Sequence, residues 1–391
     1  MTPCELVLEP PAHEMSQEEI LKQVGHVSPR LANVAFSENG RLLRFDAPDT
    51  EAAELTRQIE TIARKVERSL RSLQRKVVFR SRYADRTRFS GDGTAPGIRF
   101  LGLGQVALSA MPLRLFQYFD RVFEAIGEEW SADPLRAPTL IPVETLAKCD
   151  YFRSFPHIVT FATHLAERHE TITGFRARHQ KADSLDETAL SDMVRPEAGL
   201  SPAVCYHAYS MNAGTVVPAG GITYGMRGKC FRYEASNLRD LRRLWDFTMR
   251  EIVFLGARQD LLARRERATE IVSRLLDEHE LGGEIRTASD PFFVAPDAVA
   301  KTYFQLSSDT KYEISLTLPD DQRLAVGSLN YHSDFFGRAF DVRVEGADHM
   351  HSVCIAFGLE RWVYAFLCQH GNDVSRWPAV VRNAPEFRTA T

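Results

Sequence analysis

Apolar side chains recur every three or four residues between Glu51 and Gln74, and this spacing predicts one long amphipathic helix. The apolar face consists of Leu55, Ile59, Ile62, Val66, Leu70 and Leu73. The opposite face carries Arg57, Arg64, Lys65, Arg68 and Arg71. These cations form either a solvated helix surface or a docking face for an acidic partner. Residues 41–48 predict a short strand before this helix, whereas the first forty residues show only weak patterning.

Beyond residue 96 the apolar pattern alternates between helical and extended segments. Helices are predicted at 111–130, 261–279 and 360–368, and strands at 138–142, 214–233, 312–318 and 323–329. Residues 238–254, rich in arginine and aromatic side chains, are predicted to form a helix or a strand followed by a helix. The polar, glycine-rich stretch 80–96 separates a small N-terminal region, residues 1–95, from a large domain, residues 96–391.

The composition describes a globular protein of enzyme size rather than a strongly charged binding protein. Hydrophobic residues make up 44% and charged residues 26% of the 391 residues, and the formal net charge is −4. This balance gives no bulk electrostatic reason to expect a nucleic acid partner. The six cysteines form no CxxC pair, which favours reduced thiols and a cytoplasmic location. Neither a signal peptide nor a membrane-spanning run is expected.

The segment FRYEASNLRDLRRLWDFTMREI, residues 231–252, combines charged and aromatic residues suited to nucleotide chemistry. Attack of a carboxylate on the α-phosphate of ATP builds negative charge, which a fixed guanidinium stabilises bidentately. An aromatic ring offers the adenine a stacking surface, and a carboxylate can accept from its amino group. The segment resembles the second signature of class II aminoacyl-tRNA synthetases. The positions that carry the resemblance are Phe231, Arg232, Glu234, Arg243, Phe247 and Glu251.

Two further segments resemble the other class II signatures. FGLERWVYAF, residues 357–366, resembles the third signature, in which a glycine and an arginine open a helix. Gly358 would let the backbone approach a nucleotide closely. The residues GLER alone also occur at ordinary helix starts. The resemblance therefore depends on the distance of this segment from the second signature. The predicted helix ending at Trp130 and the strand ending at Pro142 loosely fit the first signature, which serves in dimer formation.

The class II resemblance implies an α+β fold, with an antiparallel β-sheet flanked by helices after the small N-terminal α/β region. It also implies a homodimer that uses ATP and Mg²⁺ to make an aminoacyl-adenylate. Under this resemblance, Arg232 contacts the α-phosphate and the substrate carboxylate, and Glu234 holds the amino edge of the adenine. Phe247 stacks on the adenine, and Arg361 covers its other face. Arg243 is the candidate for the γ-phosphate.

Residues 311–319 and 328–340 resemble the seryl subgroup of class II, in its atypical, methanogen-type kind. The seryl pattern has a metal-binding glutamate before its serine, but Ala325 and Val326 occur here, which leaves the magnesium ligand open. The atypical kind holds zinc with two cysteines and one glutamate. The matching positions in this chain are Cys205, Glu251 and Cys354.

The zinc assignment depends on the resemblance and not on the spacing of the cysteines. Two thiolates and a carboxylate leave one tetrahedral position open, as in catalytic zinc sites. The resemblance implies that the substrate amino group takes that position. Without the family resemblance, a lone buried cysteine is usually interpreted as a small apolar core residue. The cysteines that keep this interpretation are Cys4, Cys149, Cys230 and Cys368.

The acceptor of the activated amino acid separates three functional hypotheses. A tRNA-acylating enzyme needs a large tRNA-binding domain, yet only about 95 residues precede the predicted catalytic domain. A seryl-type catalytic domain without that arm resembles the bacterial amino acid:[carrier protein] ligases. These load glycine or alanine onto the phosphopantetheine thiol of a small carrier protein, which makes tRNA an unlikely partner. The alternatives are an atypical seryl-tRNA synthetase and a non-catalytic paralogue, and retention of Arg232, Glu234 and Arg361 argues against the paralogue.

Carrier proteins are typically acidic, so exposed arginines are the candidates for docking one. One candidate surface is the predicted helix 261–279, and the other is the cationic face of residues 57–71. The arginines of the first surface are Arg264, Arg265, Arg267 and Arg274. For any one of them a solvated helix face is the alternative.

Overall fold

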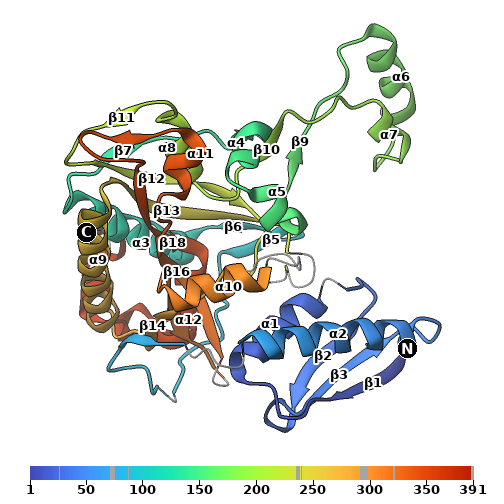
Figure 1. Cartoon of the computed structure of the whole chain (residues 1–391), viewed down its shortest axis with the longest axis horizontal. Coiled ribbons are helices and arrows are strands. Elements are labelled where there is room, and N and C mark those ends of the chain that lie inside the picture. Colours follow the sequence, from blue (N-terminus) through green and yellow to red (C-terminus); the bar gives the residue numbers. More distant parts are fainter. Residues whose placement is uncertain are drawn as a thin grey trace.

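An eight-stranded sheet forms the centre of the protein in a computed structural model, which describes residues 1–25, 27–70, 75–86, 88–234, 238, 240–290, 298–319 and 322–388 (Figure 1). The strand order is β4-β14-β15-β16-β18-β13-β12-β7. In that order the strands span Val77–Arg80, Gly283–Thr287, Lys311–Thr317, Arg323–Tyr331, His351–Gly358, Asp246–Gly256, Ile222–Phe231 and Asp133–Leu135. Neighbouring strands are antiparallel except β12 and β7, which run parallel.

Three helices build the main core against this sheet. They are α3 (Ala110–Glu128), α9 (Arg258–Glu278) and α12 (Leu359–His370). Aromatic side chains fill the contact, and the ring of Phe123 stacks on Phe357 with centroids 4.0 Å apart. Burying an aromatic side chain of this size stabilises the fold by about 2–3 kcal/mol relative to leaving it exposed. The predicted helices at 111–130, 261–279 and 360–368 are therefore confirmed, and so is the α+β class.

The other face of the sheet carries two short helices and the polar side chains that concern function. These helices are α8 (Cys205–Met211) and α11 (Phe335–Phe340), which pack against β13 and β18. Because side chains alternate along a strand, residues on β13, β16 and β18 that point away from the main core point toward α8 and α11. A second, smaller buried cluster lies there and includes Cys205, Cys354 and Tyr209.

The N-terminal region has more regular structure than its weak pattern indicates. A three-stranded antiparallel sheet in the order β1-β3-β2 consists of Thr2–Val7, Leu42–Ala47 and Ala32–Ser37. Helices α1 (Glu14–Val24) and α2 (Ala52–Leu70) pack on each other and cover it with a core of their own. Helix α2 confirms the predicted amphipathic helix as far as Leu70, and Leu73 lies outside the described residues.

Strand β4 and helix α10 (Ala298–Ser307) connect the N-terminal region with the large sheet. Strand β4 precedes the predicted boundary at residue 96 but is hydrogen-bonded to β14 in the large sheet. Helix α10 contacts α2 in Figure 1. The division of the chain into residues 1–95 and 96–391 remains a prediction.

A small sheet and an extended arm branch from the large sheet. Strands β8 (Leu140–Pro142), β10 (Ala198–Leu200) and β9 (Phe161–Ala162) pair in that order. Between β9 and β10 the chain forms helices α6 (His169–His179) and α7 (Thr188–Ser191), which project away from the body in Figure 1. Six further short elements are α4 (Val143–Lys148), α5 (Tyr151–Ser154), β5 (Ile98–Gly102), β6 (Gln105–Leu108), β11 (Val216–Val217) and β17 (Arg343–Val344). Within the described part of the chain, no helix combines the length and apolar character that crossing a bilayer requires.

One segment departs from its predicted structure. The helix proposed within residues 238–254 is wrong, because Asp246–Gly256 is the extended strand β13. From Arg250 to Gly256 every residue of this strand is buried. Strand β13 lies between β12 and β18, with α12 and α9 on one face and α8 on the other. A strand covered on both faces needs apolar side chains at nearly every position, so it shows no alternation from which to recognise it.

Candidate functional site

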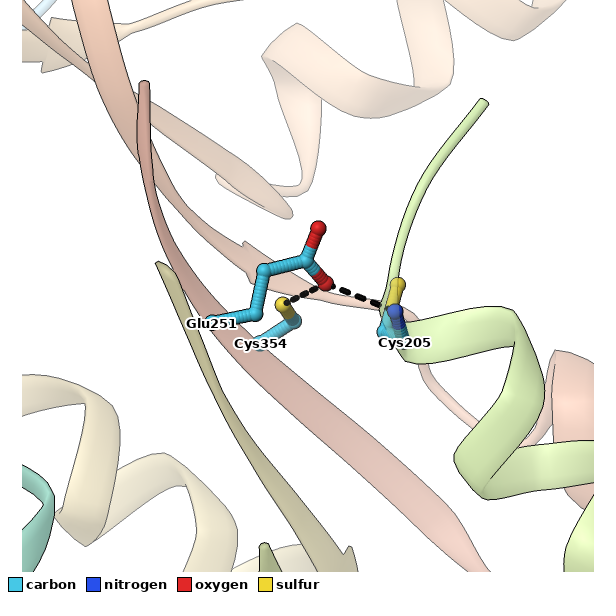
Figure 2. Close-up of side chains that lie close together, drawn as sticks. All are labelled: Cys205, Glu251 and Cys354. Carbon is cyan, nitrogen blue, oxygen red and sulfur yellow. Dashed lines mark hydrogen bonds between the residues drawn. The ribbon is translucent and has the colours of Figure 1, made fainter. Parts of the chain in front are cut away.

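Cys205, Glu251 and Cys354 meet at the junction of α8 with the centre of the sheet (Figure 2). Cys205 is the first residue of α8, Glu251 lies on β13 and Cys354 lies on β18. In the antiparallel register Glu251 faces Ala356, and Cys354 stands two residues away on the same side of β18. Gly228 on β12 lets the segment before Cys205 lie close to the sheet, because a Cβ there would come within 3.3 Å of Val204.

The three side chains form a compact, buried donor set. Their ligand atoms all lie within 4.8 Å of one another, and the residues are at most 6% exposed. The Cys354 Sγ donates to Glu251 Oε2 at 3.3 Å. The backbone N–H groups of Val204 and Cys205 donate to the two carboxylate oxygens at 3.1 and 2.8 Å. The carboxylate is therefore held in one orientation by groups at the start of α8.

Burial and the neighbouring carboxylate raise the pKa values of both thiols in this set. The hydrogen bond with Cys205, burial and the Glu251 charge raise the pKa of Cys354 well above its ordinary value. The hydrogen bond from Cys354 lowers the pKa of Cys205, but burial and the Glu251 charge outweigh it and leave that pKa raised. Both thiols thus keep their protons at neutral pH unless a cation stabilises the thiolates.

The donor set fits a zinc ion in both chemistry and spacing. Zinc prefers thiolate, imidazole and carboxylate ligands at about 2.0–2.3 Å in a tetrahedron, which places ligand atoms about 3.5 Å apart. The donor atoms are already close to this separation, so closure around an ion needs only small side-chain rotations. Three protein ligands leave a fourth position for another molecule. The fit supports the zinc assignment of these residues, which remains a prediction.

Arg232 and Phe247 lie next to each other at the end of the β12–β13 hairpin. The guanidinium carbon of Arg232 is 5.5 Å from the centroid of the Phe247 ring. The Nε of Arg232 donates to the carbonyl oxygen of Pro202 at 3.0 Å, three residues before Cys205. This bond fixes the plane of the guanidinium, and among the described residues no hydrogen bond occupies its two terminal nitrogens.

Glu234, Arg243 and Arg361 lie beside this pair. Arg243 Nη1 and Glu234 Oε2 are 3.6 Å apart. The guanidinium of Arg361 donates to the carbonyl oxygens of Arg242 at 2.7 Å and Ala325 at 3.0 Å. Burial lowers the pKa of Arg361, Glu234 raises it, and the charges of Arg243 and Arg232 lower it further. The five residues predicted from the two signatures to bind the nucleotide are thus gathered into one cluster.

Glu360 supports this cluster but was not identified from the sequence. Its carboxylate is 3% exposed and accepts from the Thr248 backbone N–H at 3.0 and 2.8 Å and from its hydroxyl at 2.9 Å. It therefore joins the start of α12, next to Arg361, to the strand residue that follows Phe247. A buried acidic side chain at a helix start carries no sequence signal that distinguishes it from a solvated one.

Glu313 is a second residue that was not identified from the sequence. It lies on β15 opposite Ser328 of β16, and the nearby Ser315 and Ala325 form the next pair on the same face. Its carboxylate accepts from Ser315 Oγ at 3.0 Å, and its charge acts on Arg361. Within the part of the chain that the structure describes, Glu313 has no ion-pair partner. Strand β15 therefore offers a carboxylate, whereas Ala325 on the neighbouring strand β16 does not.

Among the arginines of the predicted docking face on α9, the structure excludes Arg265. Arg264 donates to Thr223 Oγ1 at 2.7 Å and to the carbonyl oxygen of Gly220 at 3.3 Å. Arg265 is 8% exposed, donates to the carbonyl oxygen of Asp309 and lies over the Tyr312 ring. Arg265 is thus covered, whereas Arg264 is half-buried and stays a candidate.

The other cationic candidates are partly neutralised. On α9, Arg267 pairs with Glu270 at 3.0 Å, and Arg274 is exposed. On α2, Arg57 pairs with Glu54 at 2.5 Å and Arg64 pairs with Glu60 at 2.6 Å. Such exposed pairs add at most about 1 kcal/mol to stability, but they cancel the local charge that would attract an acidic partner.

No protein-family model matches the chain, but individual proteins do. Amino acid–[acyl-carrier-protein] ligases 1 and 2 of Bradyrhizobium diazoefficiens are 32% and 33% identical over 261 and 264 residues. The matches cover 65% and 66% of this chain, and 77% and 75% of those ligases. Among solved structures, M. kandleri seryl-tRNA synthetase in complex with A. aeolicus tRNASec has a TM-score of 0.67 at 22% identity. That match covers 98% of this chain and 76% of the synthetase chain.

These comparisons confirm the resemblance to the class II synthetase fold and the resemblance to the carrier-protein ligases. The synthetase likeness confirms the fold, a large antiparallel sheet flanked by helices. The two ligases share a third of their residues with this chain over three quarters of their length. The chain therefore belongs to the amino acid–[acyl-carrier-protein] ligases, enzymes with the catalytic fold of the class II aminoacyl-tRNA synthetases.

Proposed function

We propose that this ligase activates glycine or alanine with ATP and transfers it to the phosphopantetheine thiol of a small acidic carrier protein. The observation that carries the proposal is the arrangement of two groups on one face of the sheet. The Pro202 carbonyl that anchors Arg232 lies three residues from Cys205, so the arginine and aromatic cluster adjoins the Cys205, Glu251 and Cys354 set. An amino acid held at one group is thereby presented to a nucleotide held at the other.

The nucleotide is assigned to the cluster around Phe247. The adenine stacks on Phe247, with its amino edge at Glu234 and with Arg361 over its other face. The terminal nitrogens of Arg232 contact the α-phosphate and the substrate carboxylate, and Arg243 takes the γ-phosphate. The carboxylate oxygen attacks the α-phosphorus, the bond to the β-phosphate oxygen breaks, and pyrophosphate leaves. The charge that develops on the α-phosphate is stabilised by an arginine that the Pro202 carbonyl already holds in place.

Zinc and magnesium complete the proposed site. Cys205, Glu251 and Cys354 would hold Zn²⁺, and the bound ion would supply a Lewis acid for the substrate amino group. For Mg²⁺, a hard ion that prefers oxygen ligands, Glu313 and Ser328 offer a carboxylate and a hydroxyl on paired strands. Glu313 fits this role because its charge reaches Arg361 and no basic partner neutralises it among the described residues. The carboxylate of Glu313 would thus act from β15, the strand next to Ala325 on β16.

Transfer follows from the chemistry of the adenylate, a mixed anhydride. The carrier thiolate attacks the carbonyl carbon, the bond to the phosphate oxygen breaks, and AMP leaves with its charge on the phosphate. Thiols are substantially ionised near neutral pH, so the step requires no strong base from the protein. A homodimer around α3 and β8 is part of the proposal, because these elements occupy the positions of the first class II signature.

Seryl-tRNA formation is the second candidate, because the likeness to a synthetase crystallised with tRNASec extends over 98% of the chain. Labelled glycine, alanine and serine are therefore offered, with ATP and Mg²⁺, to holo carrier protein and to total bacterial tRNA in parallel. We expect label on the carrier that hydroxylamine removes, which identifies a thioester and the amino acid together. Label on tRNA without label on the carrier refutes the proposal.

A further inference from the structure

Asn330 lies on β16, directly opposite Cys354 of β18 in the antiparallel register. Residues that face each other across two paired strands point to the same side of the sheet, with Cβ atoms about 4.5–5.5 Å apart. The Cys354 thiol points toward Glu251, so the amide of Asn330 lies on the face that carries the Cys205, Glu251 and Cys354 set. Asn330 is therefore a neighbour of the proposed zinc site without being one of its three donors.

The amide of Asn330 has one end with a hydrogen-bond partner and one end without. Its Nδ2 donates to Ser328 Oγ at 3.1 Å, two residues earlier on the same strand. Its Oδ1 is buried and accepts no hydrogen bond from the described residues. Burying an acceptor without a donor costs free energy, and native proteins rarely do so. An oxygen in this state next to a binding site indicates that a ligand supplies the donor.

The donors nearest to this oxygen in the sheet are directed elsewhere. Lys311 of β15 is the partner of Asn330 on its other side, and the Lys311 ammonium pairs with Asp290. The Cys354 thiol donates to Glu251 Oε2 at 3.3 Å. The two side chains that flank the amide across the strands therefore do not satisfy Oδ1.

The place of Asn330 along the sheet favours the amino acid, rather than the nucleotide, as its ligand. On β13, Phe247 belongs to the nucleotide cluster and Glu251 to the donor set, while Val253 pairs with Cys354 in the row that contains Asn330. A strand rises about 3.3 Å per residue, so this row lies about 20 Å along β13 from Phe247. An amino acid whose carboxylate faces the nucleotide therefore directs its amino group toward Asn330.

We propose that Asn330 binds the amino group of the substrate, accepting one of its N–H groups at Oδ1. This inference rests on the proposed function, in which the amino group lies at the open position of the zinc site. An amine that gives its lone pair to a metal keeps its N–H groups, which are donors. A neutral amide oxygen accepts one of them without adding a further negative charge to two thiolates and a carboxylate. The contact fixes the rotation of the amino acid about its nitrogen, so that its carboxylate stays turned toward the nucleotide.

The test compares Asn330→Leu with Asn330→Asp. Leucine has a similar size and lacks the acceptor, whereas aspartate keeps an oxygen at the position of Oδ1. Asn372→Leu is the matched control, because Asn372 is exposed and donates to the carbonyl oxygen of Thr94, outside the site. Each protein is loaded with Co²⁺ in place of zinc and titrated with glycine and with alanine, and the change in the visible spectrum is followed. ATP and Mg²⁺ are left out, so that an effect through Ser328 and magnesium does not enter.

We expect the cobalt spectrum of Asn330→Leu to equal that of the wild type before amino acid is added. Its half-saturating concentration of glycine should be about tenfold higher, because a hydrogen bond to a group that carries charge is lost. Alanine should lose affinity by the same factor, since the two substrates share the amino group. Asn330→Asp should stay within about threefold of the wild type, and Asn372→Leu should match it.

The outcomes separate this inference from the proposed function. Unchanged glycine affinity in Asn330→Leu, or an equal loss in Asn330→Asp, overturns the role of the Oδ1 acceptor and leaves the zinc site standing. A cobalt spectrum altered before glycine is added overturns it as well, because Asn330 then acts on the metal site itself. A different loss for glycine and alanine overturns the assignment to the amino group. Wild-type protein that binds no metal, or whose cobalt spectrum ignores amino acids, overturns the zinc assignment too, while thioester formation on the carrier is tested without the metal.

Discussion

Replacing Arg232 by alanine tests the nucleotide site most directly. The Nε of Arg232 is bonded to the Pro202 carbonyl, so its two terminal nitrogens are the groups left for the α-phosphate. A hydrogen bond that involves a charged group contributes about 1.5–3 kcal/mol, so two such bonds contribute about 3–6 kcal/mol. Each 1.36 kcal/mol is a tenfold change in rate, and Arg232→Ala should slow adenylate formation by about 10²–10⁴-fold.

The same geometry predicts that lysine does not replace this arginine. Lysine has one nitrogen, which cannot bond the Pro202 carbonyl and also present two donors to a phosphate. Arg232→Lys should therefore lose most of the activity that Arg232→Ala loses. Loss of the Pro202 hydrogen bond, which involves the charged guanidinium, costs about 1.5–3 kcal/mol of stability. This is less than the roughly 5–15 kcal/mol of a typical folded protein, so both variants should remain folded.

The assay is ATP–pyrophosphate exchange dependent on glycine or alanine, with thermal unfolding measured on the same samples. Arg274→Ala is the matched control, because Arg274 is an exposed arginine on α9 away from the cluster. It should exchange pyrophosphate at the wild-type rate. Exchange within a factor of three of wild type in folded Arg232→Ala would remove Arg232 from the reaction and refute the reasoning.

Three further predictions concern the metals and pH. Cys205→Ser should lose zinc by elemental analysis, whereas Cys230→Ala, a buried cysteine outside the donor set, should keep it; the reverse result would contradict the assignment. Glu313→Gln should raise the Mg²⁺ concentration needed for half-maximal exchange by about tenfold, since one charged ligand is lost, and an unchanged requirement excludes Glu313 as a ligand. Burial lowers the pKa of His279 to about 4, against 6.5 as its ordinary value. Between pH 4 and pH 6.5, His279 is therefore protonated in the unfolded chain and neutral in the folded chain. Its contribution to the free energy of unfolding is fully present above pH 6.5 and is lost as the pH falls toward 4. His279→Gln should flatten this dependence in denaturant unfolding measured at several pH values, and an unaltered slope would show that other groups cause it.

Helix α9 was predictable because its apolar side chains lie on one buried face, whereas α12 is an apolar run that is buried at nearly every position. Residues 261–279 and 360–368 are helical as predicted, with apolar side chains toward the sheet. Strand β13 was not predictable in this way, because both of its faces are covered and its apolar residues run without alternation. The N-terminal strands β1 and β2 escaped recognition for another reason: many of their side chains are exposed, so their pattern is weak.

The residues of the proposed site also differ in how far the sequence alone could identify them. The predicted nucleotide residues were named through a resemblance to one continuous signature, since Arg232, Glu234 and Phe247 lie within one short segment. The donor set was named only through a family resemblance, because 46 residues separate Cys205 from Glu251 and 103 separate Glu251 from Cys354. No spacing rule links residues so distant, and only the pairing of β13 with β18 and the placement of α8 bring them together.

By itself the sequence determined which residue types could do the chemistry, and the tertiary structure decided which of them can act together. Periodicity and motifs report on neighbours within a few residues, because helices and strands are local. Whether Arg265 is exposed and whether Glu313 lies near the position of Ala325 depend on contacts between distant elements. Packing of a sheet against helices fixes those contacts, and no local pattern encodes them.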